Sequence, residues 1–232
     1  MKKGTLLIVT GSVMILSALA LAGHNFYTAD TAYRDAEAVL GQLQDIIPEK
    51  EQPMPSFGEN EAGDDNITFE TEQIPDIEEG KDSTEETKAP VYEAIPELEM
   101  PVRVVDDQEY IGILEISDIS VKLPVISRMS YPKLKKAPCR YSGSAYTDDL
   151  VIGAHCYEKF FARLKNVSSG AQIKFTDMDG NVFIYRAVSK ETIDEKNDDE
   201  LKSGEWALSL FTCPVMTNTD KRIVLRCERI YQ

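Results

Sequence analysis

The sequence predicts an all-β domain, a sandwich or barrel with one short helix beside it, which follows a membrane-spanning segment and an acidic linker. Three observations support this prediction. Short apolar or alternating runs separated by turn residues recur from residue 101 onward, a spacing typical of a sandwich or barrel. An uncharged apolar run lies near the start of the chain. Most of the net charge of −15 lies between these two parts.

Residues 1–27 are expected to form a membrane anchor. Lys2 and Lys3 precede an uncharged apolar run, residues 5–22. As a helix this run reaches about 27 Å, close to the roughly 30 Å of a bilayer's hydrocarbon core. The paired lysines favour a cytoplasmic N-terminus, so we expect a single-pass protein of the cell membrane with an extracellular body. The alternative is a cleavable signal peptide, because Ala20-Leu21-Ala22 fits a small-residue cleavage site.

Residues 28–48 predict a juxtamembrane helix that ends at Pro48. Apolar residues recur there at steps of three and four, which is typical of one helical face. They are Ala32, Ala36, Val39, Leu40, Leu43, Ile46 and Ile47. We expect a short stalk helix that packs on a second copy of the chain or on the membrane surface.

Residues 49–100 predict a flexible acidic linker. They hold 17 Asp or Glu, 3 Lys and five prolines. Such a stretch buries too little apolar surface to offset its ordering entropy, and its like charges extend it. The alternative, an acidic segment that binds calcium or a partner, lacks a spaced Asp-x-Asp-x-Asp-Gly loop. Charge is nearly balanced elsewhere, so no basic surface supports nucleic-acid binding.

Residues 101–232 predict the folded domain. The expected strands are 110–116, 119–125, 150–154, 171–175, 182–189, 206–212 and 222–228. Segment 157–167 differs, because its apolar residues have helical spacing and Gly170 follows it. These residues are Phe160, Phe161, Leu164 and Val167.

The side chains available for chemistry in this domain are few. His155 is its one histidine, since His24 lies at the end of the apolar run. In an exported domain, four cysteines allow two disulfides. They are Cys139, Cys156, Cys213 and Cys227. Clustered His and Cys spacing typical of zinc is absent, so no metal and no cofactor are predicted, with calcium modulation left open.

Cys213 ends the run 206–212, and Arg222 begins the next one. Two adjacent strands would therefore bring a thiol and a guanidinium together. Nearby positive charge lowers a thiol's pKa and favours the reactive thiolate, and the imidazole of His155 can move an amine proton. The guanidinium can hold a substrate carbonyl or a developing oxyanion. Strand alternation turns Cys227 away from Arg222, so Cys227 is interpreted as a core residue.

These residues resemble the sortase family, membrane-anchored cysteine transpeptidases of Gram-positive bacteria. The resemblance covers about residues 110–230. Leu150-Val-Ile-Gly-Ala-His155 resembles the strand that ends in the catalytic histidine. Leu208-Ser-Leu-Phe-Thr-Cys213 resembles the Leu-x-Leu-x-Thr-Cys signature, and Arg222-Ile-Val-Leu resembles the strand that begins with the catalytic arginine. Residues that depart from the family pattern are Ser117, Ala154 and Cys156.

The resemblance implies a closed, mostly antiparallel eight-stranded barrel and a transpeptidation reaction. Cys213 would attack the Thr–Gly carbonyl of a Leu-Pro-x-Thr-Gly-like sorting signal and form a thioacyl-enzyme. His155 would protonate the leaving amine and deprotonate the incoming one, and Arg222 would orient the carbonyl. The implied partners are surface proteins or pilins that bear sorting signals, and a cell-wall or pilin amine. Thr212 is a candidate substrate-binding residue, with a structural role as the alternative.

Two other hypotheses stay open. In the first, the chain is a catalytically silent sortase-like scaffold or binding module. In the second, it is a thiol–disulfide exchanger built on Cys213 and Cys156. The exchanger lacks Cys-x-x-Cys spacing. Cys156 forms a disulfide with Cys139 or Cys213, or it is a free, half-buried thiol that faces away from His155.

Overall fold

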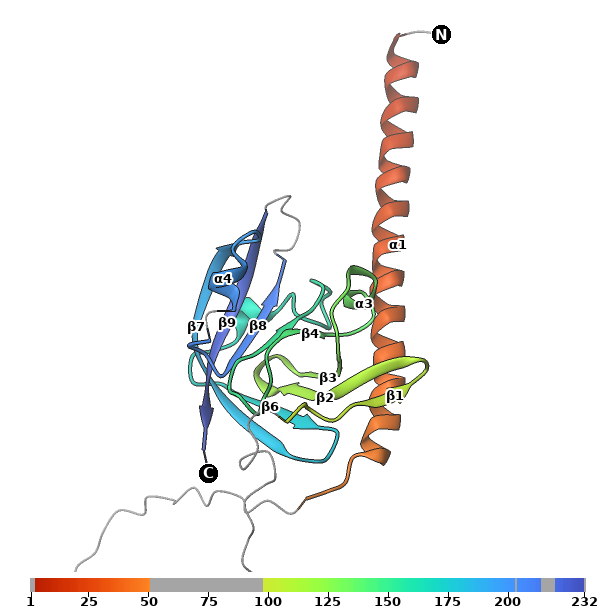
Figure 1. Ribbon diagram of the computed structural model, residues 1–232. Coiled ribbons are helices and arrows are strands. Elements are labelled where there is room, and N and C mark those ends of the chain that lie inside the picture. The colour runs from red at the N-terminus through yellow and green to blue at the C-terminus, as the bar shows by residue number, and fades with distance from the viewer. Residues whose placement is uncertain (1–2, 51–97, 203, 214–219, 232) are drawn as a thin grey trace, which may run out of the picture.

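The architecture is a closed β-barrel with a long N-terminal helix packed along one side (Figure 1). The computed structural model describes residues 3–50, 98–202, 204–213 and 220–231. Strands β2-β3-β4-β5-β8-β9-β7-β6 form a ring in that order, and pairing of β2 with β6 closes it. The pairs β3–β4 and β5–β8 are parallel, and the other neighbours in the ring are antiparallel. The barrel is therefore mostly antiparallel and eight-stranded, as expected.

The strands are β1 (Arg103–Val105), β2 (Gln108–Ile116), β3 (Val121–Ile126), β4 (Cys139–Ser142), β5 (Leu150–Gly153), β6 (Gln172–Asp177), β7 (Val182–Asp194), β8 (Leu208–Thr212) and β9 (Lys221–Ile230). Short helical elements join some of them: η1 (Ser117–Ile119), α3 (Tyr131–Leu134), η2 (Leu164–Asn166) and α4 (Asp198–Leu201). β1 adds a short antiparallel pair to the start of β2.

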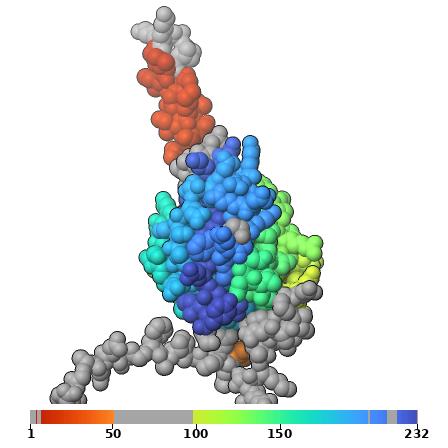
Figure 2. Space-filling model, turned by 60° about the vertical axis from the view of Figure 1, so that its left-hand side comes forward, coloured from red at the N-terminus to blue at the C-terminus, as the bar shows by residue number. Residues whose placement is uncertain are grey.

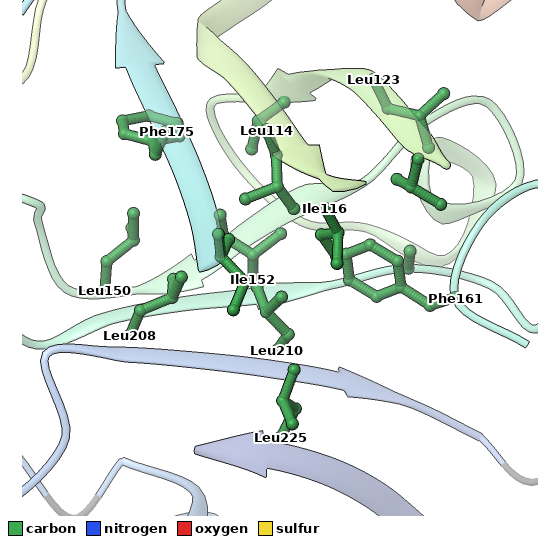
Figure 3. Close-up of a cluster of buried hydrophobic side chains, with 14 of the residues drawn as sticks. Leu114, Ile116, Leu123, Leu150, Ile152, Phe161, Phe175, Leu208, Leu210 and Leu225 are labelled. Carbon is green, nitrogen blue, oxygen red and sulfur yellow. The ribbon is translucent and has the colours of Figure 1, made fainter. Parts of the chain in front are cut away.

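Alternate strand residues point into the barrel and form its apolar core. Figure 3 shows Leu114, Ile152 and Leu210, from β2, β5 and β8, meeting with their neighbours in the barrel interior. Phe161, from the segment between β5 and β6, closes one side of this cluster. Burying a side chain of this size contributes about 1.5–3 kcal/mol, so the core holds β5 and β8 firmly in register.

The helix α1 (Lys3–Ile46) is continuous but has two unlike halves. Its N-terminal half projects from the barrel (Figures 1 and 2) and exposes large apolar side chains such as Leu7 and Ile15. By length and composition it is a candidate membrane span. The C-terminal half packs its apolar stripe against β1 and β3. The buried residues of this stripe are Ala32, Ala36, Val39, Leu40 and Leu43.

The stripe therefore packs on the barrel, and the expected packing on a second copy or on the membrane surface is wrong. Polar contacts join both ends of this interface. Lys159 Nζ lies 3.4 Å from Asp30 Oδ1 and 4.2 Å from the centre of the Tyr33 ring. Past the end of α1, Lys50 Nζ donates to Asn181 Oδ1 at 2.6 Å. The helix is fastened to the barrel along its whole C-terminal half.

Each expected strand has an observed counterpart, but β1 and β4 were not expected. Both are too short to show an alternating pattern. The helix expected at 157–167 is a series of turns that ends in η2, although the apolar residues that suggested it are all buried. The predicted linker lies almost wholly outside the described residues.

Candidate active site

Strands β5, β8 and β9 lie side by side and align the predicted site residues. The register pairs Gly153 with Phe211, and Phe211 with Val224. Glycine is required at position 153, because an added Cβ would lie 2.4 Å from the Phe211 ring. Residues two positions further along these strands lie on the same face.

Continuing this register brings His155, Cys213 and Arg222 into one row. His155 and Cys213 come two residues after the Gly153–Phe211 pair, and Arg222 comes two residues before Val224. The Ala154 amide donates to the Phe211 carbonyl at 3.1 Å, which carries the β5–β8 pairing one residue past β5. Neighbouring strands are about 4.8 Å apart, so the imidazole, thiol and guanidinium can reach one substrate group.

Arg222 lies in an aromatic and acidic environment. Its guanidinium carbon is 5.0 Å from the centre of the Phe211 ring. Nη2 is 3.5 Å from Glu195 Oε1, and Nη1 is 3.7 Å from Asp198 Oδ1. The Tyr141 hydroxyl donates to the same Asp198 oxygen at 2.7 Å. Only 12% of the Arg222 side chain is exposed, and among the described residues its Nη1 has no hydrogen-bond partner.

The thiol and the imidazole of the row both favour their neutral forms. Partial burial, followed by the negative charge of Glu195, raises the pKa of Cys213, while Arg222 lowers it. Burial, followed by the positive charge of Lys135, lowers the pKa of His155. At neutral pH the resting pair is therefore a thiol and a neutral imidazole. A neutral imidazole is able to accept the thiol proton.

Thr212 stands next to the thiol but faces the other way. Its side chain is buried, and its hydroxyl donates to the Ala154 carbonyl at 2.9 Å. This bond joins the end of β8 to the residue before His155. The structural alternative thus has direct support, and Thr212 positions the strands that carry Cys213 and His155.

The four cysteines are all free thiols. Cys139 and Cys227 are buried, and burial raises the pKa of each to about 12. Cys227 lies in the barrel core, as its strand position indicated. Cys156 is half-buried, and burial raises the pKa of its thiol. A free, half-buried Cys156 was one of the alternatives.

Sequence reasoning missed the residues that surround Arg222, namely Tyr141, Glu195 and Asp198. Tyr141 lies on the unpredicted strand β4, and the two carboxylates lie in a polar segment after β7. A local signal existed for part of this segment, because Asn197 caps α4 by accepting from the Glu200 amide at 3.3 Å. In the described part of the chain, no group of three or more His, Cys, Asp or Glu is placed to hold a metal ion.

A closed barrel with a thiol, an imidazole and a guanidinium at the ends of three adjacent strands is a site suited to cysteine-based acyl chemistry. A Sortase domain family model matches residues 114–230, half of the chain. The chain therefore belongs to the sortase family, whose members are generally cysteine transpeptidases.

Solved structures of sortases are similar to about half of the chain. Sortase A from Corynebacterium diphtheriae is 18% identical, with a TM-score of 0.48 over 54% of this chain and 62% of that one. Sortase C from Clostridium perfringens SM101 is 23% identical, with a TM-score of 0.46 over 53% and 71%. The chain thus spans less than two thirds of the Corynebacterium protein. No curated protein matches the sequence, and the family assignment rests on the family model.

Proposed function

We propose that the chain is a cysteine transpeptidase that cleaves a Leu-Pro-x-Thr-Gly-like sorting signal and transfers the cleaved protein to an amine. One observation carries the proposal: the strand register aligns His155, Cys213 and Arg222 in a single row. Membership of the sortase family supports both the reaction and the general substrate class. The amine belongs to a cell-wall precursor or to a pilin.

The side chains of the row account for each proton in the first half-reaction. The thiol proton of Cys213 passes to the neutral imidazole of His155 as the sulfur attacks the threonine carbonyl carbon. An N–H of Arg222 donates to the developing oxyanion, and the ion pairs with Glu195 and Asp198 hold the guanidinium in place. The C–N bond then breaks, and the imidazolium protonates the leaving glycine amine.

The second half-reaction reverses these roles. An incoming amine attacks the thioester carbonyl and loses its proton to His155. The C–S bond breaks, and the Cys213 thiolate regains a proton from the imidazolium. The peptide bond is thereby exchanged with no net change in protons, and the mechanism uses no cofactor.

The N-terminal half of α1 would hold this site at the membrane. Its exposed apolar side chains and the span length support insertion, and Lys2 and Lys3 favour a cytoplasmic N-terminus. The barrel then lies outside the cell, where surface proteins with sorting signals and cell-wall amines are found.

Intact-mass spectrometry of the full chain in detergent tests the reaction. The chain is incubated with Leu-Pro-x-Thr-Gly-type peptides under reducing conditions, with and without an amine acceptor. We expect a mass increase equal to the acyl fragment that maps to Cys213 and is discharged by the amine. Cys213→Ala should abolish the adduct, and Cys139→Ala is the matched control that keeps it.

Turnover that survives Cys213→Ala contradicts the proposed nucleophile. A wild-type chain that forms no adduct with any peptide of the panel favours the silent scaffold. Reduction of a test disulfide that depends on Cys213 and Cys156 favours the exchanger.

A further inference from the structure

The segment between β3 and β4 is unusually basic for this domain. Residues 128–136 contain four basic and no acidic side chains, namely Arg128, Lys133, Lys135 and Lys136. Basic and acidic residues are equal in number over 101–232 as a whole. We call residues 128–136 the basic segment.

The charges of the basic segment are open to an external partner. Arg128, Lys135 and Lys136 are exposed. Within the described residues, no carboxylate lies at ion-pair distance from any of the four basic side chains. Tyr131 is 68% exposed, and Lys135 Nζ lies 4.9 Å from the centre of its ring. An exposed aromatic ring among unpaired cations is typical of a surface that meets a membrane interface.

The position of the basic segment relative to α1 is fixed by packing. Leu134 and Ala137 share an apolar cluster with Val39 and Leu40 of α1. Figure 1 shows α3, in the middle of the basic segment, closer to the N-terminal end of α1 than strands β1, β2 and β3 are. The basic segment thus lies on the side of the barrel that faces the candidate membrane span.

The distance from the span to the barrel is short. The apolar run ends at Ala22, and the barrel first contacts α1 at Asp30, through Lys159. Asp30 comes eight positions after Ala22 in the same helix, a rise of about 12 Å. The polar layer on each side of a bilayer is about 5–8 Å deep, so an inserted helix brings this side of the barrel close to the lipid headgroups.

We propose that the basic segment is a docking surface for the anionic phospholipid headgroups of the membrane that holds α1. The charge is complementary, because Arg and Lys donate strongly to phosphate oxygens. Residues 191–200 hold six Asp or Glu and one Lys, and Figure 1 shows α4, within them, at the same end of the barrel as α3 but across the barrel from α1. We therefore expect the lipid contact on the α1 side of this end alone. This inference rests on the membrane insertion of the proposed function.

Fluorescence quenching in reconstituted vesicles tests the docking surface. The reporter is the full chain with Tyr131→Trp and Trp206→Phe, so that one tryptophan remains. It is placed in vesicles of phosphatidylcholine alone or with phosphatidylglycerol, each containing lipids brominated near the headgroup end of the acyl chain. We expect quenching that increases with phosphatidylglycerol and that falls in high salt, because salt screens exposed charges.

Two charge variants of the reporter sharpen the test. Arg128→Gln with Lys133→Gln and Lys136→Gln should lower the ratio of docked to undocked barrel about fivefold for each charge removed. Lys135 is kept, since it acts on His155. The matched control replaces Arg103, Lys122 and Lys174 with Gln in the same way. These residues lie on β1, β3 and β6 with about two fifths of each side chain exposed, and their loss should leave quenching unchanged.

Equal quenching in neutral and anionic vesicles overturns the docking surface, and so does quenching that survives the basic-segment variant. Carbonate extraction and the Cys213 adduct are measured on the same preparations. Release by carbonate contradicts membrane insertion, and absence of the adduct contradicts the proposed reaction. An inserted, acylated chain without anion-dependent quenching contradicts the docking surface alone.

Discussion

Two charged segments flank the candidate site, and each acts on a different residue of it. The basic segment (128–136) brings Lys135 near His155, and its other charges face outward. The acidic segment (191–200) turns Glu195 and Asp198 toward Arg222. His155 and Arg222, at the two ends of the row, therefore take their electrostatic environments from different connections between strands, and the two ends can be altered separately.

The two ends also differ in how firmly they are held. Arg222 has two ion-pair partners and stacks near two rings, those of Phe211 and Tyr141. His155 meets the ring of Tyr157 edge-on, with 4.4 Å between ring centres. A substrate carbonyl would thus meet a preorganised guanidinium, while the imidazole has more freedom to serve two different amines.

The largest losses of activity should follow from replacing His155 or Arg222, the two ends of the row. We expect His155→Gln to lower kcat/KM by about 10²–10⁴-fold, because the proton shuttle is lost. We expect Arg222→Lys to cost about 10²–10³-fold although charge is kept, because an ammonium lacks the planar fork. Transpeptidation kinetics with a sorting-signal peptide measure both. Arg186→Lys, exposed and paired with Glu228, is the control, and near-normal rates in either site variant would remove its assigned role.

A smaller loss of activity should follow when a contact between the acidic segment and Arg222 is removed. Asp198→Asn removes a charge that holds Arg222 but leaves the thiol and imidazole in place. We expect kcat to fall roughly tenfold with little change in KM, because the guanidinium is less well positioned. Tyr141→Phe should act in the same direction, since its hydroxyl donates to Asp198. Asp199→Asn, at an exposed neighbouring position, is the matched control, and equal losses in it and in Asp198→Asn would argue against positioning.

The hydrogen bond from the Thr212 hydroxyl to the Ala154 carbonyl joins the ends of β8 and β5 and is expected to contribute to stability. Thr212→Val keeps the side-chain volume but removes the donor to Ala154. We expect the free energy of unfolding to fall by about 1–3 kcal/mol, measured by chemical denaturation of the full chain in detergent. Thr212→Ser retains the hydroxyl and should recover most of the loss. A Val variant as stable as the wild type would show that this bond does not hold the strands together.

The smallest expected effects are shifts in titration. Glu195→Gln removes a negative charge that raises the pKa of Cys213, so the alkylation of Cys213 should have its midpoint at lower pH. Lys135→Gln removes a positive charge that lowers the pKa of His155, so the imidazole should titrate at higher pH. Iodoacetamide kinetics and NMR of the imidazole give the two midpoints. Shifts in the opposite directions would contradict this account of the two sides, and Lys122→Gln should shift neither.

Local patterns in the sequence predicted a sandwich or barrel and the proximity of Cys213 to Arg222, whereas the closed barrel and the role of His155 were implied by the resemblance to sortases. Alternating apolar runs mark strands such as β2 and β8, and Cys213 and Arg222 stand at the ends of such runs. The surroundings of Arg222 were not predictable in this way. Tyr141 and Asp198 are 57 residues apart, and only the closed ring brings β4 beside the acidic segment.

The surface against which the apolar stripe of α1 packs was wrongly predicted for a related reason. A 3–4 spacing of apolar residues shows that one helical face is buried, but it does not identify the surface that covers it. Ala36 and Leu43 would look the same against a second copy, a membrane or the barrel. The tertiary contact with β1 and β3 decides the matter.

The continuous helix α1 has a consequence for how the chain and its proposed substrate would meet. Since its C-terminal half is packed on the barrel from Ala32 to Leu43, an inserted chain carries Cys213 at a nearly constant height above the bilayer. A substrate with its own membrane segment would then be found by lateral diffusion within a thin layer. Its effective concentration is set by the number of molecules per unit of membrane area, and a barrel detached from α1 would lose that advantage even with every catalytic group intact.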